Sequence, residues 1–236
     1  MDPLILGIIV LAGIVRGVSG FGGAMLIAPP LSILLDPVSA VVHALALEAV
    51  AAVAVVPWIW RMIEARTLLM IGLPALLAIP FGGWLLVTLD AELIGTLLAV
   101  TVIGFSTVLM MGFRHKARPK PGPAAAVGAA SGLLFGATSM GGPPVILYLL
   151  AGPADHTTTR ANLMVFISAA CAVALILPWQ AGHVDRATAT GIGLLILPYL
   201  GGIWLGTRLF PLIDERLFRR LTLVFMIGVS VFALVA

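Results

Sequence analysis

Nearly the whole chain is divided into apolar stretches that are long enough to cross a lipid bilayer. Hydrophobic residues make up 61% of the 236 residues and charged residues only 10%, with a mean hydropathy of +1.17, whereas charged residues average about 25% in soluble domains. About 20 apolar residues in a helix span the hydrocarbon core, which is about 30 Å thick. Because no comparable length remains for a soluble domain, the sequence predicts an all-α integral membrane protein.

The chain contains two copies of one unit. Gly17-Val-Ser-Gly-Phe-Gly-Gly23 aligns with Gly136-Ala-Thr-Ser-Met-Gly-Gly142 at an offset of 119 residues. The same offset relates three further pairs: Asp36 and Asp155, His43 and Asn162, and Gly82-Gly83 and Gly201-Gly202. A constant offset over separate segments indicates an internal repeat. We therefore predict one membrane domain of two repeats, 1–113 and 123–236, joined by a basic, proline-rich cytoplasmic linker over 114–122.

Each copy is expected to hold one long interrupted stretch and three ordinary transmembrane helices. The predicted segments are 3–35, 38–60, 67–88 and 92–113 in the first copy, and 123–152, 156–179, 187–208 and 216–236 in the second. The residues of the stretch 3–35 would extend about 50 Å as one helix, which exceeds a single bilayer crossing. That stretch must therefore tilt strongly or turn back as a re-entrant hairpin.

The distribution of basic residues favours hairpins, because Lys and Arg concentrate in short cytoplasmic loops. If both first stretches are re-entrant, only Arg186 falls outside the cytoplasm, and eleven basic residues fall inside: Arg61, Arg66, Arg114, Lys116, Arg118, Lys120, Arg160, Arg208, Arg216, Arg219 and Arg220. Two complete crossings would divide them seven against five. A first stretch that crosses the bilayer, combined with a re-entrant second stretch, would divide the basic residues equally well but would break the repeat symmetry. We predict three spans plus one broken or re-entrant helical hairpin per half, two inverted repeats, and both termini outside the cytoplasm of a multi-pass protein of the cell (inner) membrane.

The two glycine motifs lie at the tips of the expected hairpins, near the bilayer centre. Glycine adopts backbone conformations that other residues avoid, and a helix that restarts after a tip presents free N–H groups and a positive dipole end, which bind anions. The motifs therefore predict an anion site formed by the two tips. Its candidate residues are Ser19, Gly20, Phe21, Gly22 and Gly23, with Thr138, Ser139, Met140, Gly141 and Gly142. The alternative is that these small residues only allow close helix packing.

Two charged side chains are expected at a similar depth. Arg16 precedes the first motif, and a charge at the bilayer centre costs at least about 2.5 kcal/mol on insertion scales, so Arg16 should have a partner. That partner is either a substrate anion or Glu48, which lies about 18 Å into the helix that begins at Asp36-Pro37. Glu48 is the candidate for proton coupling. A static ion pair with Arg16 and a position facing a water-filled vestibule are the alternatives.

Further polar residues lie near the expected ends of the spans. His43 and Asn162 occupy equivalent positions in the two copies and are candidates for lining the path to the site, or else for helix packing. Asp36 and Asp155 are expected to be helix N-caps. Arg160 could steer anions inward, but we expect it to snorkel to the cytoplasmic interface.

The two motifs resemble those of the TauE/SafE family of membrane permeases. The resemblance rests on Gly17-Val-Ser-Gly-Phe-Gly-Gly23 with Pro29-Pro30-Leu31, and on Gly136-Ala-Thr-Ser-Met-Gly-Gly-Pro-Pro144, and it extends over essentially the whole chain. It implies a secondary transporter, exporter or permease of sulfite, thiosulfate, sulfonates or related small anions. The implied substrate position is near the membrane midplane between the two glycine motifs, with proton coupling as an option.

Other functions are less consistent with the sequence. A passive anion channel shares every feature above, and differs only in a flux that is insensitive to ion gradients. A membrane-embedded enzyme is disfavoured because the sequence has neither a Cys/His metal-ligand cluster nor a Walker A loop, and we predict no cofactor. A scaffold would not require paired helix breaks. The net charge of +3 reflects orientation in the bilayer rather than nucleic-acid binding, and the sequence leaves a homodimer open.

Overall fold

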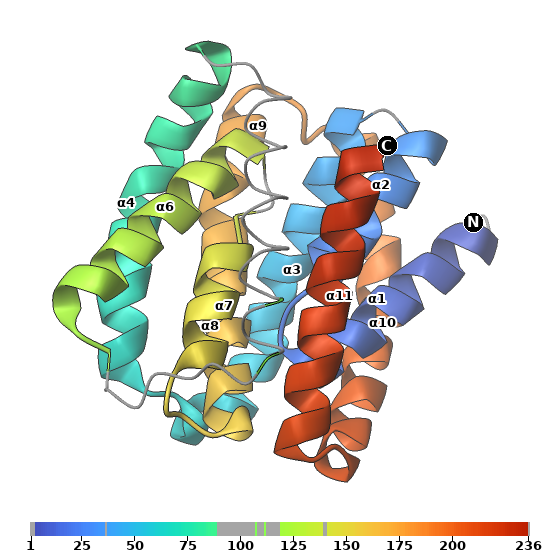
Figure 1. Ribbon diagram of the computed structural model, residues 1–236. Coiled ribbons are helices and arrows are strands. Elements are labelled where there is room, and N and C mark those ends of the chain that lie inside the picture. The colour runs from blue at the N-terminus through green and yellow to red at the C-terminus, as the bar shows by residue number, and fades with distance from the viewer. Residues whose placement is uncertain are drawn as a thin grey trace. The chain divides into compact units, whose positions relative to one another are not determined.

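The regular elements of the described residues are helices. The computed structural model describes residues 3–35, 37–88, 107, 111, 119–138 and 141–235 (Figure 1). The helices are α1 (Pro3–Ser19), α2 (Gly23–Leu34), α3 (Pro37–Ile59), η1 (Trp60–Met62), α4 (Ala65–Thr88), α6 (Pro121–Thr138), α7 (Pro143–Ala151), α8 (His156–Ala174), α9 (Ile176–Gln180), α10 (Arg186–Leu209), η2 (Phe210–Leu212) and α11 (Glu215–Val235).

Four segments of the described residues are long and apolar enough to cross a membrane. They are Val38–Met62, Ala65–Gly82, His156–Gln180 and Arg186–Leu212. These segments coincide with four of the predicted spans, and α11 provides a helix at the fifth, 216–236. The predicted span 92–113 lies almost entirely outside the described residues. The prediction of an all-α membrane protein is therefore confirmed.

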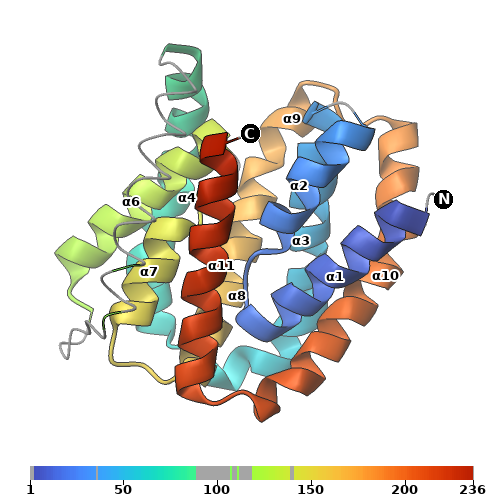
Figure 2. The ribbon, with the colours of Figure 1, turned by 45° about the vertical axis from the view of Figure 1, so that its right-hand side comes forward.

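The first long stretch is interrupted at its glycine motif. Helix α1 ends at Ser19, the backbone has positive φ at Gly20 (83°) and Gly22 (88°), and α2 begins at Gly23. Positive φ strains residues that have a Cβ atom, so these two positions favour glycine. Helix α2 packs against both α1 and α3, and Figure 2 shows the chain turning back at this interruption. The predicted helix break is present, and at about 25 Å α1 is too short to cross a bilayer core of about 30 Å.

The second long stretch is interrupted at the equivalent place. Helix α6 ends at Thr138, and α7 begins at Pro143. Gly141 packs against Ser131 of α6, whose hydroxyl donates a hydrogen bond to the Gly141 carbonyl oxygen, so the chain also turns back here. Helix α6 begins at Pro121, two residues before the predicted boundary, because proline is well suited to the first turn of a helix.

Aspartates begin several of the helices. Asp155 Oδ1 accepts a hydrogen bond from the Thr158 backbone N–H at 2.7 Å, which confirms its predicted role as an N-cap. Asp185 caps α10 in the same way, and the Thr188 backbone N–H lowers the pKa of its carboxyl group. Asp36 lies outside the described residues.

The described helices form two compact units, each of which contains helices from both sequence copies. Unit 1 comprises residues 1–61 and 160–213, and therefore holds α1, α2, α3, most of α8, and α10. Unit 2 comprises residues 62–159 and 214–236, and holds α4, α6, α7 and α11.

Glycines bring two helices into backbone contact within unit 1. Helix α1 runs beside α10 (Figures 1 and 2). Gly13 and Gly17 of α1 face Gly202 and Gly206 of α10, and a Cβ atom on Gly13 would lie only 2.5 Å from the Tyr199 carbonyl oxygen. Small residues allow membrane helices to approach this closely. The packing interpretation of the motif glycines therefore holds for Gly17.

An equivalent contact joins α4 and α6 within unit 2. Gly82 of α4 lies against the Leu133 backbone, and Gly128 and Gly132 of α6 lie against the backbone of α4. The first helix of each copy therefore packs on the second span of the other copy, α1 on α10 and α6 on α4.

Adjacent glycines of α10 provide a matched test of this packing. A Cβ atom at Gly202 would lie 3.0 Å from Gly13 Cα, whereas a Cβ atom at Gly201 would meet nothing within 4 Å. We expect Gly202→Ala to lower the free energy of unfolding by about 1–3 kcal/mol through overpacking. Gly201→Ala should be neutral or slightly stabilising, because alanine favours helix by up to about 1 kcal/mol. Thermal unfolding of the two purified variants in detergent measures the difference, and equal stabilities would contradict the contact.

Candidate functional site

Three buried charged side chains gather around the first helix break in unit 1. Arg16 comes from α1, Glu48 from α3 and Arg160 from α8, and their exposed fractions are 2%, 0% and 4%. Charged side chains inside a membrane protein are costly and require partners. The partners of these three side chains therefore define the chemistry of the break.

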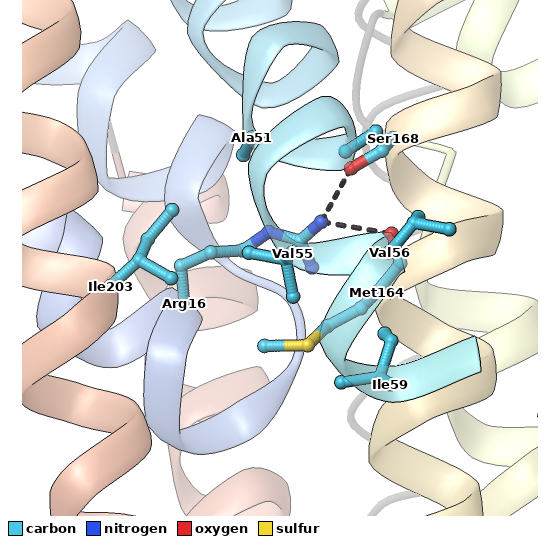
Figure 3. Close-up of a pocket in the computed structure, with 9 residues that line it drawn as sticks. Arg16, Ala51, Val55, Val56, Ile59, Met164, Ser168 and Ile203 are labelled. Carbon is cyan, nitrogen blue, oxygen red and sulfur yellow. Dashed lines mark hydrogen bonds between the residues drawn. The ribbon is translucent and has the colours of Figure 1, made fainter. Parts of the chain in front are cut away.

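Arg16 is held entirely by protein groups. Its Nε lies 2.7 Å from Glu48 Oε2, which forms a buried ion pair. Its Nη1 donates to the Gly20 carbonyl oxygen, and its Nη2 donates to the Met164 carbonyl oxygen (3.0 Å) and to Ser168 Oγ (2.8 Å; Figure 3). Of the two partners expected for Arg16, Glu48 is therefore present in this structure.

The carboxylate of Glu48, a residue of α3, lies at the N-terminal end of α2. Its Oε1 accepts hydrogen bonds from the Ala24 backbone N–H (3.1 Å) and from the Tyr199 hydroxyl (3.0 Å). A Cβ atom on Gly23 would collide with Glu48 Oε1 and the Tyr199 hydroxyl, so glycine is needed for this approach. The sequence predicted that a substrate anion would bind at such a helix end, but here a carboxylate of the protein takes that place. Its exposed fraction is 0%, so Glu48 does not face a water-filled vestibule in this structure.

The break is stabilised by its own backbone and side chains. The Ser19 hydroxyl lies within hydrogen-bond distance of the Val15 and Phe21 carbonyl oxygens (2.8 and 2.6 Å), and its oxygen accepts from the Phe21 backbone N–H at 3.2 Å. Phe21 is fully buried. A Cβ atom on Gly20 would lie 2.6 Å from the Arg160 carbonyl oxygen, so α8 packs directly on the break. Ser19 thus uses its hydrogen-bonding groups to shape the break.

Arg160 does not snorkel to an interface, contrary to the sequence-based expectation. Its side chain is buried, donates from Nε (2.9 Å) and from Nη2 to the Gly17 carbonyl oxygen, and donates from Nη2 to Thr207 Oγ1 at 3.0 Å. The guanidinium also lies 4.3 Å from the centre of the Phe210 ring. Arg160 is buried because it binds the end of α1, where carbonyls in the last turn of a helix lack intrahelical partners. The one sequence signal for this contact is an arginine inside an apolar span.

The remaining candidates of unit 1 are buried in helix contacts. His43 Nδ1 donates to the Ser39 carbonyl oxygen at 2.7 Å, and a Cβ atom on Gly191 of α10 would lie 2.9 Å from its Nε2. Helix packing is thus the observed environment of His43. Asn162 is buried in α8, two residues after Arg160.

The second copy carries uncharged residues at the positions equivalent to the ion pair. The offset of 119 residues places Phe135 and Ile167 where the first copy has Arg16 and Glu48. Gly141 and Gly142 are buried in unit 2. The Thr138 side chain and the whole of Ser139 and Met140 lie outside the described residues.

A narrow crevice leads to Arg16 within unit 1. It is lined by side chains from α1, α3, α8 and α10, of which Arg16 and Ser168 are polar and the others, such as Val55 and Ile203, are apolar (Figure 3). The crevice does not enclose space for a water-sized sphere. The structure is therefore closed around the Arg16 guanidinium.

The buried ion pair can be tested by a double-mutant cycle. Removing one partner of such a pair costs about 3–5 kcal/mol, because the other charge is left uncompensated, whereas replacing both partners with apolar residues is often neutral. We therefore expect Glu48→Leu to unfold at a lower temperature than the Arg16→Met, Glu48→Leu double variant. Thermal unfolding in detergent measures both, and additive losses would mean that the two side chains do not interact.

Comparison with known proteins identifies one family. The family described as sulfite exporter TauE/SafE matches residues 5–233. No curated protein and no solved structure matches the chain. Because the family match covers nearly the entire sequence, the chain belongs to the sulfite exporter TauE/SafE family and is a multi-pass membrane transporter, not an enzyme.

Proposed function

We propose that the protein is a secondary transporter of small sulfur-containing anions, such as sulfite, thiosulfate or sulfonates, and that it binds the anion at the first helix break. Membership in a sulfite exporter family supports the substrate class. The observation that carries the proposal is the arrangement around Glu48. An arginine, a helix N-terminus and a tyrosine hydroxyl converge on one buried carboxylate.

The groups that hold Glu48 are suited to any small oxyanion. Arginine forms strong charge-assisted hydrogen bonds with oxyanions, and the backbone N–H groups at a helix N-terminus bind sulfate, phosphate and carboxylate alike. A sulfite or sulfonate oxygen can therefore replace a Glu48 oxygen at the Ala24 N–H. Glu48 and the substrate compete for the same donors.

Competition with a titratable carboxylate provides a route to proton coupling. Glu48 is faced by Arg16 from α1, the Ala24 N–H from α2 and the Tyr199 hydroxyl from α10, and Cys171 of α8 lies within electrostatic range. Protonation of Glu48 removes its attraction to Arg16 and frees these donors for the substrate. Proton uptake and anion binding then favour each other, as linkage requires.

Transport also needs the closed crevice to open. The crevice beside Arg16 has no room for a sulfite-sized anion, so its walls on α3 and α8 must separate for substrate entry. Two inverted repeats would supply the two alternating openings. The reciprocal packing of α1 on α10 and of α6 on α4 supports such a repeat, because equivalent helices of the two copies make equivalent pairings.

The inverted topology can be tested with two equivalent positions. Leu35 follows α2, and Ala154 lies at the same offset of 119 residues in the second copy. In the inverted arrangement, Leu35→Cys should react with a membrane-impermeant thiol reagent from outside intact cells, and Ala154→Cys only after permeabilisation. The native thiol of Cys171 is buried and should give little background. Labelling of both positions from one side would exclude the inverted repeat.

Transport can be tested by anion flux into proteoliposomes, with and without an imposed proton gradient. We expect wild-type protein to take up at least one of sulfite, thiosulfate and a small sulfonate in a gradient-dependent manner. A hydrogen bond to a charged group contributes about 1.5–3 kcal/mol, so Arg16→Ala should reduce uptake at least about tenfold.

The matched control is Arg61→Ala, which removes an exposed arginine of η1 that stacks on Trp60. Its uptake should equal that of the wild type. Flux that ignores the gradient would instead favour a passive anion channel. The absence of flux for all three anions would contradict the proposed substrates, and an unchanged Arg16→Ala variant would contradict the proposed site.

A further inference from the structure

Among the described residues of unit 1, the buried cluster carries more positive than negative charge. Its buried ionic side chains among the described residues are Arg16 and Arg160 on one side and Glu48 on the other. Arginine keeps its charge in proteins, so the cluster has a net charge of +1 when Glu48 is ionised. Within the described part of the chain, Glu48 is the carboxylate that pairs with Arg16, and Arg160 has no carboxylate within ion-pair distance.

The partners of Arg160 are all neutral. They are the Gly17 carbonyl oxygen, Thr207 Oγ1 and the face of the Phe210 ring. Dipoles and an aromatic ring stabilise a cation, but they do not cancel its charge. The described residues place no negative charge beside Arg160, and Coulomb attraction in an apolar interior favours an anion there.

Arg160 and Arg16 contact the same four-residue segment. Arg160 donates to the carbonyl oxygen of Gly17, and Arg16 donates to that of Gly20. Like charges that contact one short segment repel each other, and an anion near both would reduce that repulsion.

We propose that Arg160 is the second cationic residue of the anion site and that the transported anion supplies the missing counter-charge. This inference rests on the proposed transport function and specifies the charge of its substrate. With Glu48 ionised and still paired with Arg16, the net charge of +1 lies at Arg160 and balances a monovalent anion such as a sulfonate. With Glu48 protonated, the net charge of +2 balances a divalent sulfur oxyanion such as thiosulfate, which therefore moves together with one proton.

A charge cycle in proteoliposomes tests this assignment. Uptake of thiosulfate, which is divalent, is measured against uptake of methanesulfonate, which is monovalent, for four proteins: wild type, Arg160→Gln, Glu48→Gln and the double variant. Coulomb energy scales with the charge of the anion, so Arg160→Gln should lower the thiosulfate-to-methanesulfonate ratio about tenfold. Glu48→Gln should raise the ratio and make thiosulfate uptake independent of the proton gradient. The double variant has the wild-type net charge, and its ratio should return to within about threefold of wild type, because the Coulomb energy depends on the summed charge.

The cycle separates a charge effect from a structural one. A purely structural role of Arg160 would lower the uptake of both anions equally, and Glu48→Gln would not restore it. The matched control is Arg208→Gln, which removes an exposed arginine of α10 that stacks on Trp204, and its ratio should equal the wild-type ratio.

If Arg160→Gln fails to fold, Arg160→Lys provides a second variant, which keeps the charge. Its thiosulfate-to-methanesulfonate ratio should stay within about threefold of wild type, because the summed charge is unchanged. A folded Arg160→Lys variant with a ratio below that range would overturn the proposal. An unchanged ratio in Arg160→Gln, with normal wild-type transport, would overturn this inference alone. A wild-type protein that moves neither anion would contradict the transport function itself and this inference with it.

Discussion

The ion pair between Arg16 and Glu48 makes a helix break tolerable inside an apolar protein. A break leaves carbonyl groups without partners at the end of one helix and N–H groups without partners at the start of the next. Arg16 lies in the last turn of α1 and donates to the Gly20 carbonyl oxygen, while Glu48 accepts from the Ala24 N–H in the first turn of α2. Each charge therefore lies at the helix end whose dipole favours it.

The same arrangement connects the stability of the break with its proposed function. A buried ion pair is costly to disrupt when one charge is left without a partner. A substrate anion that approaches Arg16 as Glu48 becomes neutral avoids that cost, because Arg16 exchanges one negative partner for another. The helix break can therefore persist while the negative partner of Arg16 changes from Glu48 to the substrate. Neutral partners alone, such as the Ser131 hydroxyl at the Gly141 carbonyl oxygen in unit 2, would not provide such an exchange.

The sequence predicted the elements of the fold better than the contacts of the site. Hydropathy indicated the spans and the glycine motif indicated the break, because both signals are local. The Arg16–Glu48 pair was one of two alternatives, since helix depth can be estimated from residue number. The contact of Glu48 with the start of α2 depends on the packing of α2 against α3. The contact of Arg160 with the Gly17 carbonyl oxygen depends on the packing of α8 on the break. Neither contact has a local sequence pattern.

The two copies differ at the positions that hold the buried ion pair. Positions equivalent to Arg16 and Glu48 carry Phe135 and Ile167, so the second copy has the helix interruption without this pair of charges. A transporter built from inverted repeats presents one central site to each side of the membrane in turn. A second ion pair would add the cost of burying two more charges without adding a new direction of access. In the proposed transporter, the first break with its ion pair therefore determines which anions bind.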